Sequence, residues 1–299
     1  MPRVSIVLPT YEAQATLERC LDHLDSQSYR DREIIVVDSS LGLECAGIVS
    51  GRTPQVHLIR SEARLLPHQA LNLGVRSAQG ELLAFIDPDA YPRADWLLRL
   101  VEAYDARGGA IVGGVACHGS RWIDLGAHLC KFDKWLPFES SRPLNEGPTV
   151  NFLMPRELFE RHGPFPAVHW HGDTELSWRM REAGVTIRLE PAAIVEHHHL
   201  HNWRTLLAER FGRGRGFAEL RLTRTSPSWP TVLWLGATSL LPVRLVSQLL
   251  RVWRNARAAG MSWAFVLAFP VLSSGLYAWL LGECATYARG LLRRRAAAR

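Results

Sequence analysis

The sequence lacks several features that would assign it to common protein classes. Its five cysteines are odd in number and scattered, and none form a CxxC pair, so neither a disulfide framework nor a structural zinc site is expected. The first apolar run, in MPRVSIVLPTYEAQ, turns polar at Thr10, which is too early for a signal peptide. Hydrophobic residues make up 47% of the chain and charged residues only 21%, which excludes a disordered protein. We therefore expect a folded chain whose N-terminal domain faces the cytoplasm.

Long charge-free segments are confined to the C-terminal part. With 299 residues, the chain is long for one compact domain, and its composition changes at TRTSPSWP, so we expect a main domain over 1–225 and an appendage over 226–299. Residues 261–282 carry no charge and are numerous enough to cross roughly 30 Å of hydrocarbon. We expect membrane association there. A buried core helix is the alternative. Two crossings would place Arg251, Arg254 and Arg257 outside, against the positive-inside tendency, whereas a short hairpin that dips in and returns, or helices lying in the interface, would keep the arginines near anionic headgroups, and the number of crossings stays open.

Positive charge is also concentrated towards the C-terminus. The chain has a net charge of +6, with arginine clusters in 210–224, 251–257 and 289–299. This pattern favours an anionic membrane or a phosphorylated substrate. Nucleic-acid binding is not expected, because no surface of alternating aromatic and basic residues accompanies the arginines.

The N-terminal two thirds of the chain alternate between strand and helix patterns. Short β-rich apolar runs at 3–9, 32–38, 55–60 and 81–87 enclose amphipathic segments at 13–27 and 66–77. Further patterns predict a helix over 172–183, two short strands over 185–197 and a basic helix over 203–222. This alternation predicts an α/β fold with a mostly parallel central sheet and flanking helices.

Polar residues follow three of these strands directly. They are Thr10, Tyr11 and Glu12 after the first, Asp38 after the second, and Asp87 and Asp89 after the fourth. Ligands of open parallel sheets bind where the strands end, so these side chains are expected to converge. Two aspartates one residue apart repel unless a cation lies between them, and such pairs suit Mg²⁺ or Mn²⁺ bridging to phosphates. The alternative is that Asp87 caps a turn and Asp89 precedes a helix.

Five blocks of the sequence together point to a family. VLPTYEAQATLERCLDHLDSQSY, EIIVVDSS, ALNLGVRSAQGELLAFIDPDAYP, NFLMPRELFERHGPF and GDTELSWRMREAGVTIRLEPAAIVEH resemble, in order and spacing, the family 2 inverting glycosyltransferases. The resemblance covers about residues 3 to 200. It implies the GT-A fold, a Rossmann-like nucleotide-binding domain with a mostly parallel sheet, followed here by C-terminal hydrophobic helices.

The resemblance also implies roles for individual residues. Matching the family's motifs, the residues that hold the donor nucleotide are Thr10, Tyr11, Glu12, Asp38, Asn72, Asp87 and Asp89. Asp87 and Asp89 further coordinate a divalent cation, Mg²⁺ or Mn²⁺, and His197 is the best match for a histidine completing that metal shell, with His198 and His199 as alternatives. Asp173 falls where the family places its catalytic base. Otherwise Asp173 is a helix N-terminal charge facing the macrodipole.

Several positions depart from the family's pattern. The usual Asp-Asp-Gly-Ser after the second strand is DSS here, the glutamate expected before the base is Gly172, and the arginine expected before Asn72 is Leu71. The QxxRW block of processive synthases is absent, since QLLRVW has the wrong spacing. We expect transfer of one or few sugars from a nucleotide-diphosphate sugar to a hydroxyl of a glycan or lipid-linked acceptor, with inversion. The alternatives are an inactive nucleotide-sugar-binding membrane scaffold and a nucleotidyltransferase, although the latter lacks its glycine-rich loop.

Overall fold

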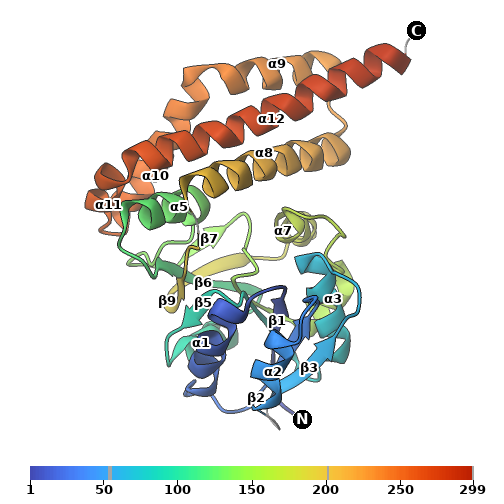
Figure 1. Ribbon diagram of the computed structural model, residues 1–299, viewed down its shortest axis with the longest axis vertical. Helices are drawn as coiled ribbons and strands as arrows, with labels where there is room; N and C mark the ends of the chain where they lie inside the picture. Colours follow the sequence, from blue (N-terminus) through green and yellow to red (C-terminus); the bar gives the residue numbers. More distant parts are fainter. Residues whose placement is uncertain (53–55, 201, 298–299) are drawn as a thin grey trace. The chain divides into compact units, whose positions relative to one another are not determined.

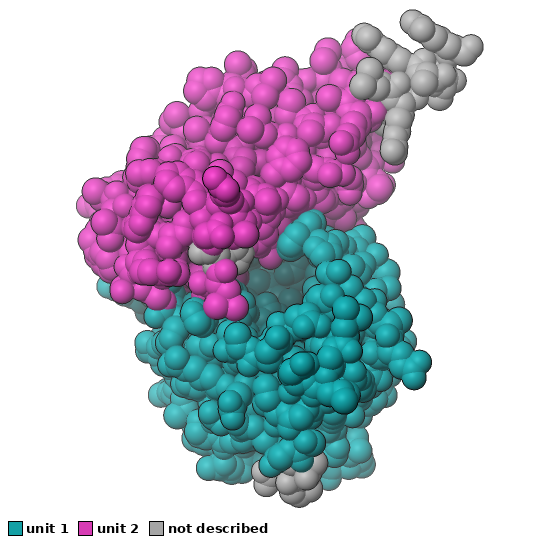
Figure 2. Space-filling model, viewed as in Figure 1, with its two compact units in different colours: residues 1–118, 135–198 teal, residues 119–134, 199–299 magenta. Residues whose placement is uncertain are grey.

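The computed structural model describes residues 1–52, 56–200 and 202–297 and divides the chain into two compact units (Figures 1 and 2). The first unit consists of 1–118 and 135–198, and the second of 119–134 and 199–299. The boundary after residue 225 expected from composition differs from this division in two ways. The second unit already begins at His199, and it recruits the earlier segment Gly119–Lys134.

A mixed sheet forms the centre of the first unit. Its described strands are β1 (Val4–Thr10), β2 (Arg32–Asp38), β3 (Val56–Arg60), β4 (Leu82–Ile86), β5 (Ala90–Pro92), β6 (Ala110–Cys117), β7 (Arg142–Leu144), β8 (Asn151–Pro155) and β9 (Ile187–His197). They are ordered β3-β2-β1-β4-β8-β6-β9-β5, with β7 beside β9. β3, β2, β1 and β4 run parallel, whereas β8 is antiparallel to both of its neighbours. The predicted α/β fold is thus confirmed, but the sheet is mixed rather than mostly parallel, because β5, β7 and β8 pair antiparallel with their neighbours.

Helices cover this sheet. The helices of the first unit are α1 (Gln14–Asp25), α2 (Glu44–Ser50), α3 (Pro67–Ser77), α4 (Trp96–Arg107), α6 (Arg156–His162) and α7 (Gly172–Glu182). Every residue of β1 is buried, as in parallel strands covered on both faces. α3 packs closely on β1 and β2, because a Cβ at Gly74 would lie only 2.4 Å from Cγ1 of Val7. That close packing fixes the position of α3, whose first turn contributes to the site described below.

The segment 187–197 is one strand rather than the two short strands predicted. β9 pairs in parallel with β6, and the register shifts between Gly113 and Gly114, which accommodates the residues around Pro191 without ending the strand. At its end β9 pairs antiparallel with the short strand β5, so that His197 lies opposite Ala90. Neither β5 nor this pairing was predicted from the sequence.

The second unit is helical throughout its described part. It contains α5 (Trp122–Phe132), α8 (Trp203–Thr225), α9 (Trp229–Leu240), α10 (Pro242–Ala258), α11 (Ser262–Leu267) and α12 (Phe269–Ala297), and α12 packs against α5, α8 and α9 (Figure 1). A Cβ at Gly214 of α8 would lie 2.0 Å from the carbonyl oxygen of Trp279, so these two helices touch through their backbones. This packing explains why α8 belongs with the C-terminal helices.

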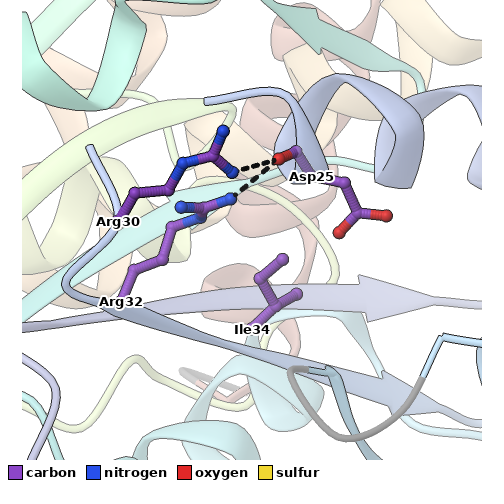
Figure 3. A pocket seen from close by; sticks show the side chains of 4 residues that line it. All are labelled: Asp25, Arg30, Arg32 and Ile34. Carbon is purple, nitrogen blue, oxygen red and sulfur yellow. Dashed lines mark hydrogen bonds between the residues drawn. The ribbon is translucent and has the colours of Figure 1, made fainter. Parts of the chain in front are cut away.

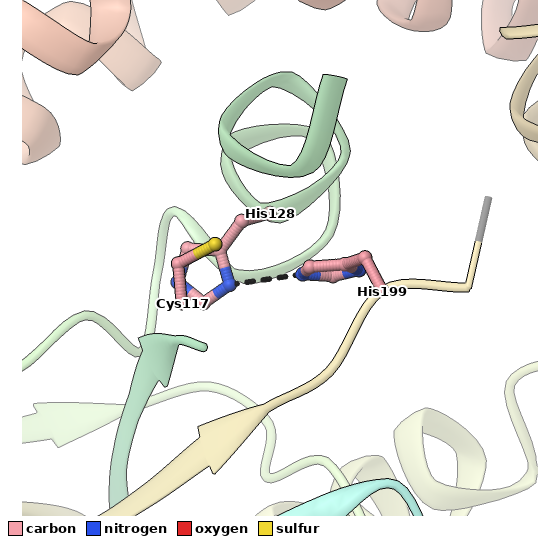
Figure 4. Close-up of side chains that lie close together, drawn as sticks. All are labelled: Cys117, His128 and His199. Atoms are coloured by element: carbon pink, nitrogen blue, oxygen red, sulfur yellow. Dashed lines mark hydrogen bonds between the residues drawn. The ribbon is translucent and has the colours of Figure 1, made fainter. Parts of the chain in front are cut away.

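Polar contacts, including the two that follow, attach α5 and the residue after it to the rest of the second unit. His128 Nδ1 lies 3.2 Å from Nε2 of His199, and both rings are buried (Figure 4). The guanidinium of Arg251 on α10 donates to the carboxylate of Asp133 over 3.0 Å. These contacts account for the recruitment of residues 119–134, which sequence composition did not indicate.

The charge-free stretch 261–282 does not form one continuous helix. It comprises α11 and the first half of α12, with a break at Ala268. Among the residues that the structure describes, no single helix is both long and apolar enough to cross a bilayer. α9 and α10 together meet that criterion, as a pair bent by 70°.

Candidate functional site

Two carboxylates and an imidazole meet beyond the end of β4. Asp87 and Asp89 lie in the turn between β4 and β5, and His197 ends β9. One ligand atom from each of the three residues lies within 4.8 Å of the other two, and Nε2 of His197 is 3.5 Å from Oδ1 of Asp89. The β5–β9 pairing creates this proximity, and the backbone N–H of His198 donates to the carbonyl of Asp89 over 2.7 Å.

The carboxylates influence their surroundings electrostatically. Burial, followed by the charges of Asp89 and Asp87, raises the pKa of the Cys20 thiol, whose sulfur lies 3.7 Å from the carbonyl oxygen of Asp87. Burial also raises the pKa of Tyr91, with a smaller contribution from Asp89. Two carboxylate oxygens and one imidazole nitrogen, partly exposed, are a donor set that fits Mn²⁺ or Mg²⁺ with room for further oxygen ligands.

The three consecutive histidines have different partners. His197 is the one beside Asp89, as the resemblance implied. His198 Nδ1 lies 3.2 Å from the hydroxyl of Tyr91, and His199 pairs with His128 in the second unit. Alternation along the extended chain turns His198 away from His197, and the pairing with His128 sets His199 apart. His197 is therefore the metal-ligand candidate that the geometry favours.

Asp38 is completely buried at the end of β2. Its Oδ1 accepts hydrogen bonds from the hydroxyl of Thr10 at 3.0 Å and from the hydroxyl of Ser40 at 2.6 Å. Its Oδ2 is buried without a hydrogen-bond partner among the described residues. A buried carboxylate oxygen in that state is costly unless a ligand supplies the missing donor. Oδ2 of Asp38 is thus placed to accept a hydrogen bond from a hydroxyl or N–H group of a ligand.

Ser40 explains part of the departure at DSS. Its hydroxyl orients Asp38 and also accepts the backbone N–H of Glu12 over 2.8 Å. Glu12 adopts a left-handed backbone conformation with φ 51°, and its carboxylate accepts the N–H of Leu41 over 3.0 Å. The loops after β1 and β2 are therefore tied together, and a second acidic residue is not needed to hold Asp38.

Tyr11 has a cationic neighbour that the sequence did not indicate. The guanidinium of Arg64, in the loop between β3 and α3, lies 4.3 Å from the centroid of the Tyr11 ring. This cation–π contact places a positive charge beside the predicted donor-binding residues. No motif distinguished Arg64 from the many other arginines of the chain.

Asp173 lies in the first turn of α7. Its Oδ1 accepts the N–H of Thr174 over 2.8 Å, and its own N–H donates to Nε2 of His68 over 3.1 Å. His68 is in the first turn of α3, which follows the carboxyl end of β3. Asp173 is therefore at the same edge of the sheet as Asp38 and Asp87. His68 was not among the predicted site residues, since only the tertiary structure joins α3 to α7.

The side chain of Asn72 contacts a loop. Its Nδ2 donates to the carbonyl of Phe165 over 2.8 Å, and its Oδ1 accepts the N–H of Phe165 over 3.0 Å. Both ends of the amide are thus engaged by one residue of the segment that leads to Asp173. A role of Asn72 in binding the donor stays a prediction.

A pocket of about 140 Å³ lies away from this site (Figure 3). It is lined by Asp25, Arg30, Arg32 and Ile34, near the start of β2, whereas the predicted site residues follow the ends of the strands. Arg30 and Arg32 both donate to the carbonyl of Asp25, at 3.0 and 3.1 Å. Burial and the neighbouring Arg30 lower the pKa of Arg32. The two guanidinium groups satisfy the last carbonyls of α1, which is a structural role.

Comparisons with known proteins agree with this geometry. A family model described as glycosyl transferase family 2 matches residues 5–163. The chain is 26% identical to glycosyltransferase AglE of Haloferax volcanii over 72% of this chain and 73% of that protein. It is 27% identical to the pre-mycofactocin glycosyltransferase of Mycobacterium tuberculosis over 92% of this chain but only 62% of that protein.

Solved structures show the same fold. A mannosyltransferase from Pyrobaculum calidifontis, in complex with GDP-Man and Mn²⁺, superposes with a TM-score of 0.61 at 20% identity, covering 98% of this chain and 88% of its own. GalNAc-T7 with UDP, GalNAc and Mn²⁺ has a TM-score of 0.54 at 18% identity, covering 67% of this chain and 44% of its own.

Proposed function

This chain belongs to glycosyl transferase family 2, and from that premise we propose the reaction that it catalyses. It is a glycosyltransferase that uses a nucleotide-sugar donor. The reaction is the transfer of one or few sugars, with inversion, to a hydroxyl group of a glycan or a lipid-linked saccharide. The observation that carries the proposal is the Asp87, Asp89 and His197 group at the same edge of the sheet as the buried Asp38.

Asp38 and the diphosphate-binding residues divide the work of holding the donor. Oδ2 of Asp38 accepts a hydrogen bond from a hydroxyl or N–H group of the nucleotide sugar, while the hydroxyl groups of Thr10 and Ser40 hold the carboxylate in place. Asp87, Asp89 and His197 would hold Mn²⁺ or Mg²⁺, which supplies positive charge to the departing diphosphate. Mn²⁺ in the two solved structures, with GDP-Man and with UDP and GalNAc, supports this choice of cation.

Asp173 is proposed as the general base. Its carboxylate takes the proton of the acceptor hydroxyl as that oxygen bonds to the anomeric carbon, and the bond from this carbon to the diphosphate oxygen breaks on the opposite side. The hydrogen bond from Thr174 N–H to Oδ1 leaves Oδ2 as the oxygen that receives the proton. Attack opposite to the leaving group inverts the anomeric centre.

Metal-dependent release of nucleoside diphosphate tests this proposal. The full-length protein, incubated with membrane extract and a panel of nucleotide sugars, should release nucleoside diphosphate with Mn²⁺ or Mg²⁺ and not with a chelator. Asp89→Asn should lower this rate by ~100-fold or more, whereas Asp95→Asn, at a half-exposed carboxylate beyond β5 that pairs with Arg99, should not. If the wild-type protein releases no nucleoside diphosphate from any nucleotide sugar, the alternative of an inactive nucleotide-sugar-binding scaffold is favoured.

We also propose that the second unit docks on an anionic membrane, with the catalytic unit on the cytoplasmic side. Large apolar side chains are exposed on three successive helices, namely Trp229, Leu233, Trp234 and Leu240 of α9, Val243, Val246 and Leu250 of α10, and Trp263, Val266 and Leu267 of α11. On α10 the exposed apolar positions continue along one face into Arg254 and Arg257. Apolar and aromatic side chains next to exposed arginines are the chemistry of an interfacial helix on anionic lipid.

Vesicle flotation distinguishes docking through the exposed apolar face of α10 from non-specific adsorption to lipid. Wild-type protein should float with vesicles containing phosphatidylglycerol and less with pure phosphatidylcholine. Replacing Val243, Val246 and Leu250 by Ser should lower the bound fraction by ~10-fold or more. Replacing Leu41 and Leu43 of the first unit, which are at least as exposed as Val246 and Leu250, by Ser is the control. Equal losses in both variants, or equal binding to both lipids, would contradict docking through α10.

A further inference from the structure

One buried histidine bridges the segment that precedes the proposed base. His68 is only 6% exposed, and its ring lies between Gly172 and Phe165. Its Nε2 accepts the N–H of Asp173 over 3.1 Å, and its Nδ1 lies 3.5 Å from the carbonyl oxygen of Val168. The ring thus contacts both ends of the segment 165–173.

These partners define the protonation state of the ring. A backbone N–H can only donate, so Nε2 of His68 must offer its lone pair to Asp173. A backbone carbonyl can only accept, so the proton resides on Nδ1, facing Val168. The neutral Nδ1–H tautomer is therefore the form that fits this position.

The hydrogen bond to Asp173 replaces a missing helix cap. α7 begins after His171, whose backbone is left-handed with φ 65° and whose side chain makes no capping hydrogen bond. The first N–H groups of a helix need acceptors from outside the helix. Nε2 of His68 supplies one from α3, and Oδ1 of Asp173 supplies the next for Thr174.

Gly172 is the residue that makes room for this ring. A Cβ at position 172 would lie 2.7 Å from both Cγ and Nδ1 of His68, which no real side chain tolerates without displacement. The glycine found where the family resemblance led us to expect glutamate is thus the steric counterpart of His68. The pair couples the first turn of α3 to the first turn of α7.

A second residue of α3 holds the same segment four positions later. Asn72 forms the two hydrogen bonds to the backbone of Phe165, and residues four apart lie on one face of a helix. Phe165 in turn packs against the ring of His68, with centroids 5.3 Å apart. The face of α3 formed by His68 and Asn72 therefore holds the segment 165–173 at both ends.

We propose that His68 is a positioning residue for the base, acting through the N–H of Asp173, with Asn72 as the second anchor. This inference rests on the proposed function, because it assigns Asp173 as the base. Without the hydrogen bond from its N–H to His68, Asp173 would hold its carboxylate at a different angle to the acceptor hydroxyl. The rate of the chemical step would then fall, whereas the nucleotide-sugar site would stay intact. His68→Asn retains a donor near the position of Nδ1 but cannot reach Asp173, whereas His68→Gln places an amide oxygen near the position of Nε2 and can accept the N–H of Asp173.

Two readouts that do not depend on catalysis test the contact itself. Nitrogen-15 NMR of the His68 ring should show the proton on Nδ1, and a protonated Nε2 would overturn the inference. Amide hydrogen exchange at Asp173 should be faster in His68→Asn than in wild type and restored in His68→Gln. Arg76→Gln, an exposed change in the last turn of α3, is the control for general loosening of that helix.

The catalytic readout separates this inference from the proposed function. His68→Asn should lower kcat by ~100-fold with an unchanged dissociation constant for Mn²⁺ and nucleoside diphosphate, and His68→Gln should recover most of the loss. Wild-type kcat in His68→Asn, in an enzyme that Asp173→Asn inactivates, would overturn the positioning role alone. Turnover in Asp173→Asn would overturn the assignment of the base, and the positioning role with it.

Discussion

The substitution Gly172→Ala tests the packing between α3 and α7. The added methyl group would lie 2.7 Å from two atoms of the His68 ring, well inside the contact distance of carbon atoms. Overpacking of this kind costs about 1–3 kcal/mol. Moving the His68 ring away from the methyl group is also unfavourable, because it weakens the hydrogen bond from Asp173 N–H, which is worth about 1 kcal/mol. We expect local destabilisation of the start of α7 by about 2 kcal/mol.

Local hydrogen exchange is the appropriate assay. The chain has two compact units, so global unfolding need not be a two-state transition. The amide of Glu175, which donates to the carbonyl of His171 over 3.0 Å, reports on the first turn of α7. A loss of about 2 kcal/mol corresponds to ~30-fold faster exchange at this amide.

A double-mutant cycle and a glycine control make this result interpretable. In a His68→Ala background the methyl group meets no ring, so Gly172→Ala should change the Glu175 exchange rate by less than ~3-fold. Gly51→Ala should have little effect on α2, because no atom lies within 4 Å of its Cβ position and its φ is −77°. Unchanged exchange in Gly172→Ala, or the same acceleration with and without His68, would refute steric coupling between positions 68 and 172.

Two further predictions concern the buried polar groups. Asp38→Ala removes the Oδ2 acceptor, so it should raise the dissociation constant of the nucleoside diphosphate ~10-fold or more and leave the affinity for Mn²⁺ unchanged. Isothermal titration calorimetry with each ligand measures both constants. Equal nucleotide affinity in the variant and the wild type would exclude contact between the nucleotide and Asp38. The folded protein keeps the Cys20 thiol protonated, since burial raises its pKa, whereas the unfolded chain releases this proton above pH ~8.5. The free energy of unfolding of the first unit, which contains Cys20, should therefore fall as pH rises above ~8.5, by up to ~1.4 kcal/mol per pH unit, and less steeply in Cys20→Ala. Identical pH dependence of the two proteins in denaturant titrations would contradict this assignment.

Much of the catalytic unit could be predicted because its signals are local. The apolar runs at β1, β2 and β4 and the spacing of Leu17, Leu21 and Leu24 on α1 follow directly from strand and helix periodicity, and the structure confirms them. Polar residues at strand ends identified Asp38, Asp87 and Asp89, because parallel strands present their carboxyl ends at one edge. The structure brings Asp87 and Asp89 together with His197, although the roles of these residues in the reaction stay predictions.

The tertiary structure decided what depends on contacts between distant segments. The proximity of His197 to Asp89 results from the pairing of β5 with β9, and the roles of His68 and Gly172 result from the approach of α3 to α7. The extent of the second unit depends on the packing of α5 and α8 against α12. Periodicity and motif spacing record the local environment of each residue, so they located the elements and the acidic residues. Partners that are some 70 to more than 100 residues apart leave no periodic signal, and only the folded chain shows which of them meet.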